Sequence, residues 1–376
     1  GLSLYKEKTC SVTYHRYPSA MRQRRLKAPA NSYSHTAYYH CISRVVNRDF
    51  VLGDDEREEF VRLMRLYERL CGLRVVTYCV MSNHFHLLVG VPKRPEVMPS
   101  NAELIDLVHG TLGEIAEASL RYDLEQAAKI KSTQWEEEIR ERYLRRMWDI
   151  SAFMKTLKQR FTQWFNRKHK RKGTLWEDRF KSVLVQSAGE PVRAMAAYID
   201  LNPIRANMVE DPAAYRWSGY GAAMGGDPLA LEGLKEIDRI SQSEEQVTAE
   251  TTAATNSPKR SSQETLESYR CLLYGRGAER GLNEDGSALK KGFSSEETQR
   301  VLAEGGRLPS MAYLRCRVRY FTDGAVIGSR SFVNDIFKST RERFGEKRKT
   351  GARLMKGLNK EEKLYALRDL RADVLG

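Results

Sequence analysis

The chain has few cysteines and no close pair of them. Its 6 cysteines are scattered, and none stands in a Cys-x-x-Cys pair, so we expect no structural zinc site. Long hydrophobic runs are also missing, since no apolar stretch reaches the roughly 20 residues that span a bilayer. We therefore expect a globular protein of the cytoplasm, where thiols stay reduced, with no membrane partner.

Acidic residues are scarce relative to basic ones. The chain carries 63 Lys and Arg against 49 Asp and Glu, which gives a net charge of +14. Such a surplus is typical of proteins that bind nucleic acids, and we favour this interpretation over a basic surface kept for solubility. With 376 residues, 41% of them hydrophobic, the chain is long enough for one large or two ordinary domains.

The spacing of apolar residues predicts an α+β fold. Strand and helix patterns alternate in the order β-α-β-β-α-β, followed by one more helix, which is the order of the split βαβ or ferredoxin-like fold. This fold has an antiparallel sheet with flanking helices, and its first and third strands lie in the centre. The strands are expected at residues 38–46, 75–80, 84–91 and 180–185, with helices from 54, over about 101–170 with breaks, and from 191.

The third predicted strand carries the triplet His84-Phe85-His86. Side chains alternate along a strand, so His84 and His86 share one face while Phe85 points to the other. Two neighbouring neutral imidazoles can hold a divalent metal ion, although a His-x-His pair on a strand is more often structural. His40 lies in the first strand, which should neighbour this one, and its role is left open.

A tyrosine and an amide follow on the last predicted helix. Tyr198 and Asn202 are four residues apart and therefore lie on one helix face. A metal ion on two histidines, facing a tyrosine, is what a tyrosine nucleophile needs to cleave a phosphodiester. Attack by Tyr198 would give a 5′-phosphotyrosine and a free 3′-OH. Because the ester keeps the bond energy, this chemistry favours strand transfer over plain hydrolysis.

A basic segment at 153–172 supports a nucleic-acid substrate. Its apolar residues Phe153, Leu157, Phe161 and Trp164 recur at helical spacing and are expected in the core, whereas the basic residues between them can neutralise phosphates. Together with basic residues of the N-terminal arm and of the strands, the predicted DNA-binding residues are Arg24, Arg25, Lys27, Arg44, Lys155, Lys158, Arg167, Lys168, Lys170, Arg171, Lys172, Arg179 and Lys181.

Four ordered motifs resemble those of a known family. They stand at residues 39–44 (YHCISR), 81–89 (MSNHFHLLV), 173–182 (GTLWEDRFKS) and 198–206 (YIDLNPIRA). With these motifs the chain resembles the IS200-like, single-tyrosine HUH transposases, and specifically the REP-associated tyrosine transposases, over roughly residues 21–225. The resemblance implies an HUH endonuclease domain that uses Mg²⁺ or Mn²⁺ to cleave and rejoin single-stranded DNA near hairpins.

The resemblance also implies roles for single residues. His84 and His86 take the metal-ligand positions, Tyr198 takes the position of the nucleophile, and Asn202 that of a third ligand, where some relatives carry Gln. Glu177 stands where Gln or Glu is expected and is counted among the catalytic residues. A bacterial, nucleoid-associated monomer or homodimer that binds single-stranded or hairpin DNA is expected.

Changes in composition predict the domain boundaries. Residues 1–32 form a basic N-terminal arm, and 33–240 the HUH transposase catalytic domain. Residues 241–265, dominated by Ser, Thr, Glu, Gln and Ala, form a linker. The mostly helical segment 266–376 is either a small second DNA-binding domain or a basic tail packed on the first domain.

Three other functions use some of the same features. A domesticated protein could bind DNA hairpins as a regulator without cutting, but the intact residues His84, His86, Tyr198 and Asn202 argue against it. An RNA-binding ferredoxin-like module leaves the histidine pair unexplained and lacks evident aromatic RNP motifs. A relaxase or replication initiator would usually show its motifs in another order.

Overall fold

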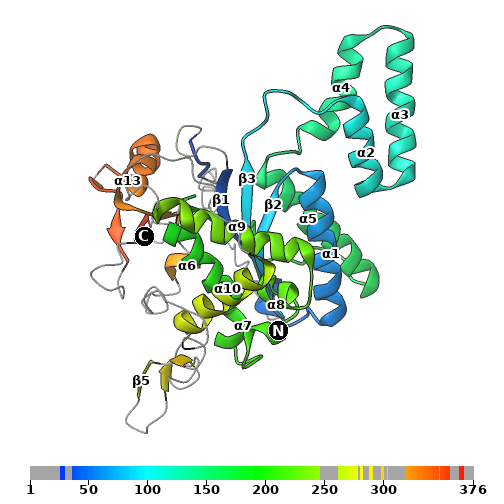
Figure 1. The fold of residues 1–376 in the computed structure, drawn as a ribbon. Coiled ribbons are helices and arrows are strands. Elements are labelled where there is room, and N and C mark those ends of the chain that lie inside the picture. Colours follow the sequence, from blue (N-terminus) through cyan, green and yellow to red (C-terminus); the bar gives the residue numbers. More distant parts are fainter. Residues whose placement is uncertain are drawn as a thin grey trace, which may run out of the picture.

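A computed structural model of the chain shows one central sheet with helices on both faces (Figure 1). The strands at its heart are β2 (Arg74–Val80), β3 (His84–Pro92), β1 (Thr36–Arg44) and β4 (Lys181–Val185). The residues that the structure describes are 26–29, 36–187, 189–245, 261–277, 280–282, 288–290, 298–299, 303, 319–322, 324–346, 348–355 and 364–367.

The four strands lie in the order β2-β3-β1-β4, and each neighbouring pair is antiparallel. This is the ferredoxin-like order predicted from the sequence, with β1 and β3 in the centre. The two central strands pair along their whole length, from Thr36 opposite Pro92 to Arg44 opposite His84. The histidine strand is therefore held on both sides and presents its side chains at fixed positions.

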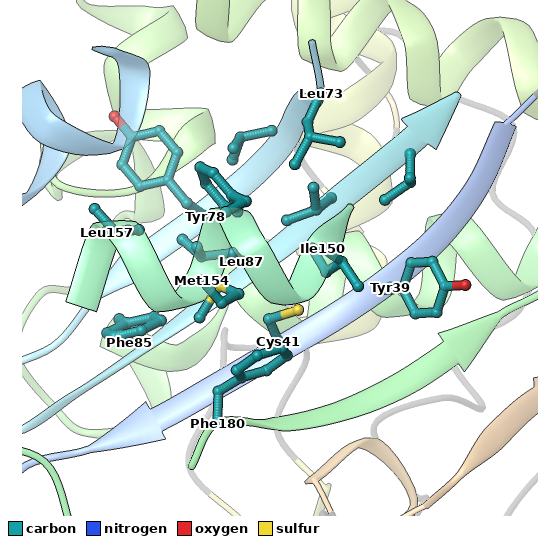
Figure 2. Packing of buried hydrophobic residues seen from close by; sticks show 14 of the residues in the cluster. Tyr39, Cys41, Leu73, Tyr78, Phe85, Leu87, Ile150, Met154, Leu157 and Phe180 are labelled. Carbon is teal, nitrogen blue, oxygen red and sulfur yellow. The ribbon is translucent and has the colours of Figure 1, made fainter. Parts of the chain in front are cut away.

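One face of the sheet is covered by α1 (Asp54–Leu70) and α5 (Ile150–Lys168). Phe85 and Leu87 of β3 pack here against Met154 and Leu157 of α5 (Figure 2). The predicted core positions of α5 are buried, except that Trp164 is only partly covered. Because alternate residues of β3 point to this apolar face, His84 and His86 point to the opposite one.

The opposite face is covered by α6 (Gly189–Asp200) and α9 (Pro228–Glu245). Leu88 of β3 packs here with Met195 and Ile199 of α6. Helix α9 runs very close to β2, because a Cβ atom on Gly233 would overlap the carbonyl oxygen of Val76. The helix that carries Tyr198 thus lies directly on the histidine side of the sheet.

Three helices between β3 and α5 form a projecting module: α2 (Asn101–Leu112), α3 (Glu114–Lys129) and α4 (Thr133–Leu144) (Figure 1). They bury an apolar cluster of their own, which includes Leu104, Leu120 and Ile139. The helical region predicted at 101–170 therefore breaks into this module and α5.

The C-terminal segment adds three short strands to the same sheet. Strand β7 (Val326–Gly328) pairs in parallel with β4, and β9 (Tyr365–Leu367) and β8 (Arg353–Leu354) continue the sheet in antiparallel pairs. Residues of 319–367 share the apolar clusters of both faces. The described part of this segment is thus packed on the sheet of the preceding domain, and it contains strands besides the expected helices.

The C-terminal helices are α10 (Ser262–Gly277), α12 (Arg319–Thr322) and α13 (Arg330–Ser339). Ser329 caps α13 by accepting a hydrogen bond from the backbone N–H of Phe332. Most of the predicted linker, 246–260, lies outside the described residues, as does most of the N-terminal arm. In the described ranges, no helix is long and apolar enough to cross a membrane.

The remaining elements are short. They are α7 (Asn202–Arg205), α8 (Gly219–Met224), the two-stranded sheet of β5 (Arg280–Leu282) and β6 (Ala288–Lys290), and 3-10 turns at Val46–Arg48, Pro212–Ala214 and Arg341–Arg343.

Candidate active site

The histidine pair lies at the start of β3, on the face covered by α6. The ring centres of His84 and His86 are 5.0 Å apart, with the rings nearly perpendicular. His86 is buried, whereas His84 is partly exposed. One member of the pair is therefore fixed in the interior and the other borders the solvent.

Tyr198, on the last turn of α6, lies against this pair. Its ring centre is 5.7 Å from that of His86, at an interplanar angle of 83°. Only 4% of Tyr198 is exposed, because α6 presents it to the sheet rather than to solvent. The structure thus brings together the histidine pair and the tyrosine, which the sequence placed on two separate elements.

Each histidine of the pair uses its Nδ1 for a hydrogen bond within the protein. His84 Nδ1 lies 2.6 Å from Oδ1 of Asn83, whose own Nδ2 donates to the carbonyl oxygen of Arg48. His86 Nδ1 lies 2.9 Å from Nε2 of His40 on β1. The nitrogen left for a further ligand is therefore Nε2 in both residues.

Burial keeps these imidazoles neutral. It lowers the pKa of His84 to about 4, with a smaller contribution from the charge of Arg44. Burial likewise lowers the pKa of His86 well below its usual value and that of His40 to about 4. Neutral histidine is the form that binds a metal ion, so the pair is in the right state near pH 7.

Arg205 is a site residue that sequence reasoning missed. Its guanidinium lies 4.6 Å from the centre of the Tyr198 ring, and its Nη1 donates to the Tyr198 carbonyl oxygen over 3.0 Å. Burial lowers the pKa of Arg205 to about 10, so it remains a cation at neutral pH. The spacing of seven residues from Tyr198, two helical turns, is the signal that could have identified it.

Asn202 lies at the junction of α6 and α7. Its Nδ2 donates to the carbonyl oxygens of Tyr198 and Ile199, at 2.9 and 3.1 Å, so the amide group caps the end of α6. These bonds fix which end of the amide points to the helix. Its Oδ1 accepts no hydrogen bond from any described residue and is the atom of Asn202 suited to a cation.

Phe321 of α12 packs against the ring of Tyr198. The two rings are stacked, with centres 4.6 Å apart and an interplanar angle of 11°. The carbonyl oxygen of Phe321 is also 2.9 Å from His40 Nδ1. No local pattern could have linked Phe321 to Tyr198, because the two residues are far apart in sequence and α12 is very short.

Glu177 does not join the histidine pair through its side chain. Its backbone N–H donates to the carbonyl oxygen of Arg44, at the end of β1, and the side chain is exposed. Within the described ranges its carboxylate has no hydrogen bond or ion pair. The backbone of Glu177 thus lies one strand away from His84, since Arg44 is opposite His84 in the sheet.

The predicted DNA-binding residues fall into three groups. Arg24 and Arg25 lie outside the described residues. Three lysines are held by the protein itself: Lys27 by Asp149, Lys168 by Asp55 and Glu56, and Lys158 by the carbonyl oxygen of Asp178. The others have exposed side chains, namely Arg44, Lys155, Arg167, Lys170, Arg171, Lys172, Arg179 and Lys181.

The histidine pair lies in a segment of the chain that matches a protein family. Residues 33–110, which span β1 to α2, match the family described as "Transposase IS200 like". Residues 33–110, called the IS200-like segment, are thus similar to this family. The IS200-like segment contains the histidine pair, Asn83 and His40, whereas Tyr198, Arg205 and Phe321 lie beyond it. The search of curated proteins finds no match.

Two solved structures are similar to parts of the chain. One is described as the structure of a REP-associated tyrosine transposase bound to a REP hairpin, with 12% identity, a TM-score of 0.32, and coverage of 53% of this chain and 86% of that one. The other is a candidate transposase from Deinococcus radiodurans, with 18% identity, a TM-score of 0.22, and coverage of 42% and 84%.

The donor atoms of the site suit a divalent ion bound by few protein ligands. In the part of the chain that the structure describes, no three His, Cys, Asp or Glu side chains form a group that could hold a metal ion. His40 cannot serve as a third ligand, because both of its ring nitrogens are hydrogen-bonded. Two imidazole nitrogens, Nε2 of His84 and Nε2 of His86, are therefore the donor atoms that the histidine pair itself offers to an ion.

Proposed function

We propose that this chain is a transposase that cleaves and rejoins single-stranded DNA through a 5′-phosphotyrosine at Tyr198. The observation that carries the proposal is the position of the Tyr198 ring, 5.7 Å from that of His86, in a chain whose segment 33–110 is IS200-like. The neutral state of the histidine pair supports the same reading, because a metal ion needs their lone pairs.

His84, His86 and Asn202 are the residues that would hold Mg²⁺ or Mn²⁺, through Nε2 of each histidine and Oδ1 of Asn202. Bound there, the ion would withdraw negative charge from a non-bridging phosphate oxygen and so ease attack on phosphorus. Both histidines are oriented by their Nδ1 hydrogen bonds, to Asn83 and His40. Oriented ligands hold a metal ion more tightly than freely rotating ones.

The covalent step uses residues of the chain. The Tyr198 oxygen forms a bond to phosphorus while the bond from phosphorus to the 3′ oxygen breaks. The phenol proton passes to solvent, and the 3′ oxygen takes up a proton to become a free hydroxyl. Arg205, whose guanidinium lies 4.6 Å from the Tyr198 ring centre, stabilises the negative charge on the phenol oxygen during attack. Reversal of the step by another 3′-OH rejoins the strands.

The substrate we propose is single-stranded DNA next to a hairpin, bound by a monomer or homodimer. The support is the motif resemblance at 39–44, 81–89, 173–182 and 198–206, together with the net charge of +14. The exposed basic residues at the end of α5 and in the following turn, Lys170 and Lys172 among them, are the proposed contacts to phosphates.

Covalent trapping tests this function. The protein is incubated with labelled single-stranded hairpin DNA from beside its own gene, with Mg²⁺ or Mn²⁺, and separated on a denaturing gel. We expect a shifted protein–DNA band that requires metal and disappears in Tyr198→Phe. Tyr220→Phe, which alters a buried tyrosine on α8, is the matched control and should keep the band. A band that survives in Tyr198→Phe would remove Tyr198 as the nucleophile.

A second candidate is a hairpin-binding regulator that does not cut DNA. The observation that favours it is the coverage of Tyr198, which is 4% exposed and stacked under Phe321. Hairpin binding without any adduct, across several hairpins and both metals, would support the regulator and contradict the transposase.

The DNA contacts are tested by salt dependence. In Lys170→Ala/Lys172→Ala, we expect the slope of log K against log salt to flatten by up to about 1.4, since each lost phosphate contact on a single strand contributes about 0.7. Lys129→Ala/Lys131→Ala, at the end of α3 and in the turn after it, is the control with the same charge change and an unchanged slope. Binding is measured by fluorescence anisotropy from about 50 to 200 mM salt, because the logarithm of the binding constant falls linearly with the logarithm of the salt concentration. An equal slope in both variants would exclude Lys170 and Lys172 from the interface.

A further inference from the structure

His40 is a fully buried histidine whose two ring nitrogens both have partners. It lies on β1 with 0% exposure, and its ring stacks on that of His86 with centres 5.1 Å apart. The sheet register puts Ile42 opposite His86, so His40 is the diagonal neighbour of His86 on the same face. Nε2 of His40 is 2.9 Å from His86 Nδ1, and Nδ1 of His40 is 2.9 Å from the Phe321 carbonyl oxygen.

These contacts determine where the protons lie. A carbonyl oxygen only accepts, so His40 Nδ1 must carry the hydrogen that points to Phe321. A neutral imidazole has one N–H, and therefore Nε2 of His40 is the acceptor. His86 Nδ1 must then be the donor of the 2.9 Å bond between the two rings. It follows that Nε2 of His86 has no hydrogen and keeps its lone pair.

The geometry points to His40 as a positioning residue that fixes the tautomer and ring orientation of His86. The backbone carbonyl of Phe321 in turn fixes the tautomer of His40. The inference deepens the proposed function, on which it rests for the role of His86 as a metal ligand. His40 itself touches neither metal nor substrate in this scheme. It acts by making Nε2 of His86 the ligand atom, as outer-shell partners of metal-bound histidines do.

The C-terminal segment thereby becomes part of the site. The carbonyl oxygen of Phe321 accepts a hydrogen bond from His40, and the ring of Phe321 stacks on that of Tyr198. It is held in place by the sheet, because Ala325 and Val326, a few residues later, bind β4 and β9. A segment outside the IS200-like region thus sets the orientation of both the histidine and the tyrosine.

The protonation pattern can be measured directly. Two-bond ¹H–¹⁵N NMR correlations of the ¹⁵N-histidine-labelled full chain, without metal or DNA, distinguish an imidazole that carries hydrogen on Nδ1 from one that carries it on Nε2. We expect the Nδ1–H form for both His40 and His86. A wild-type spectrum with His86 in the Nε2–H form would overturn the inference without any variant.

Two amide variants separate the two hydrogen bonds of His40. His40→Gln can place an amide oxygen near the former Nε2 and keep the acceptor for His86, whereas His40→Asn can replace only Nδ1 and keeps the bond to Phe321. We expect His40→Gln to retain the Nδ1–H form of His86 and to bind Mn²⁺ within about 3-fold of wild type. His40→Asn should lose that form and bind Mn²⁺ about 10- to 100-fold more weakly.

Mn²⁺ binding is followed by the EPR signal of the free ion, and circular dichroism checks the fold of each variant. Equal Mn²⁺ affinities and equal His86 spectra in the two variants would contradict a positioning role. If His86 changes its form in His40→Asn while no protein, including wild type, binds Mn²⁺, His40 still positions His86 but the proposed metal-dependent function fails.

Discussion

Replacement of His86 by alanine is expected to abolish the covalent adduct while hairpin binding changes little. His86 supplies one of only two imidazoles in the proposed ion site, and loss of charge neutralisation at the phosphate costs several kcal/mol in the transition state. We expect a fall in cleavage rate of about 100-fold or more. His84→Ala should behave in the same way. Rates are measured in single-turnover assays with labelled hairpin DNA, and binding by fluorescence anisotropy.

The control for His86→Ala is His109→Ala, which removes an exposed imidazole on α2 that pairs with Glu117. It should leave cleavage unchanged. Because His86→Ala also leaves His40 Nε2 without its partner, the thermal midpoint of each variant is compared with that of wild type. Equal losses of binding and cleavage in His86→Ala would indicate a structural role for the residue instead.

Gly233→Ala is expected to have the largest effect on stability. The glycine brings α9 against β2 so closely that any Cβ would overlap the Val76 carbonyl oxygen, which is backbone of the sheet and cannot turn aside. To fit alanine, the helix must shift and separate from the apolar cluster of Leu234 and Ile237. We expect a loss of about 3 kcal/mol or more in the free energy of unfolding, measured by urea titration.

Gly225→Ala is the matched control for this change. A Cβ there would come no closer than 3.4 Å to its neighbours, an ordinary van der Waals distance, and the backbone conformation suits any residue. Its free energy of unfolding should stay within about 0.5 kcal/mol of wild type. If the urea midpoint of unfolding of Gly233→Ala equals that of the wild type, α9 is not held against β2 in solution.

The sequence was informative where periodicity carries the information. Alternation along β3 placed His84 and His86 on one face, and the order of elements predicted that β1 and β3 lie in the centre of the sheet. The helix spacing predicted the buried residues of α5, because a helix that covers a sheet must bury one stripe of its surface. These features depend on neighbours within a few residues, which is the range over which a sequence pattern acts.

Features that depend on distant segments were not predicted. Strands β7, β9 and β8 are too short to show an alternating pattern, and their pairing with β4 is decided only by the folded sheet. The acidic residues at the start of α1 bind Lys168 and partly neutralise its charge. The basic residues that surround Lys168 in the sequence do not indicate this pairing. His40 was left open because its role is visible only once Phe321 stands beside it.

Because Phe321 lies far along the chain, it is synthesised much later than the other residues of the site. A ribosome adds roughly 5 to 20 residues per second in the direction from β1 to β9, so the 123 positions from 198 to 321 take about 6 to 25 s to synthesise. During that interval the histidine strand and Tyr198 exist without the carbonyl group that orients His40 and without the ring that stacks on the tyrosine. A nascent chain therefore contains every residue proposed to take part in the chemistry well before it contains Phe321, which orients these residues.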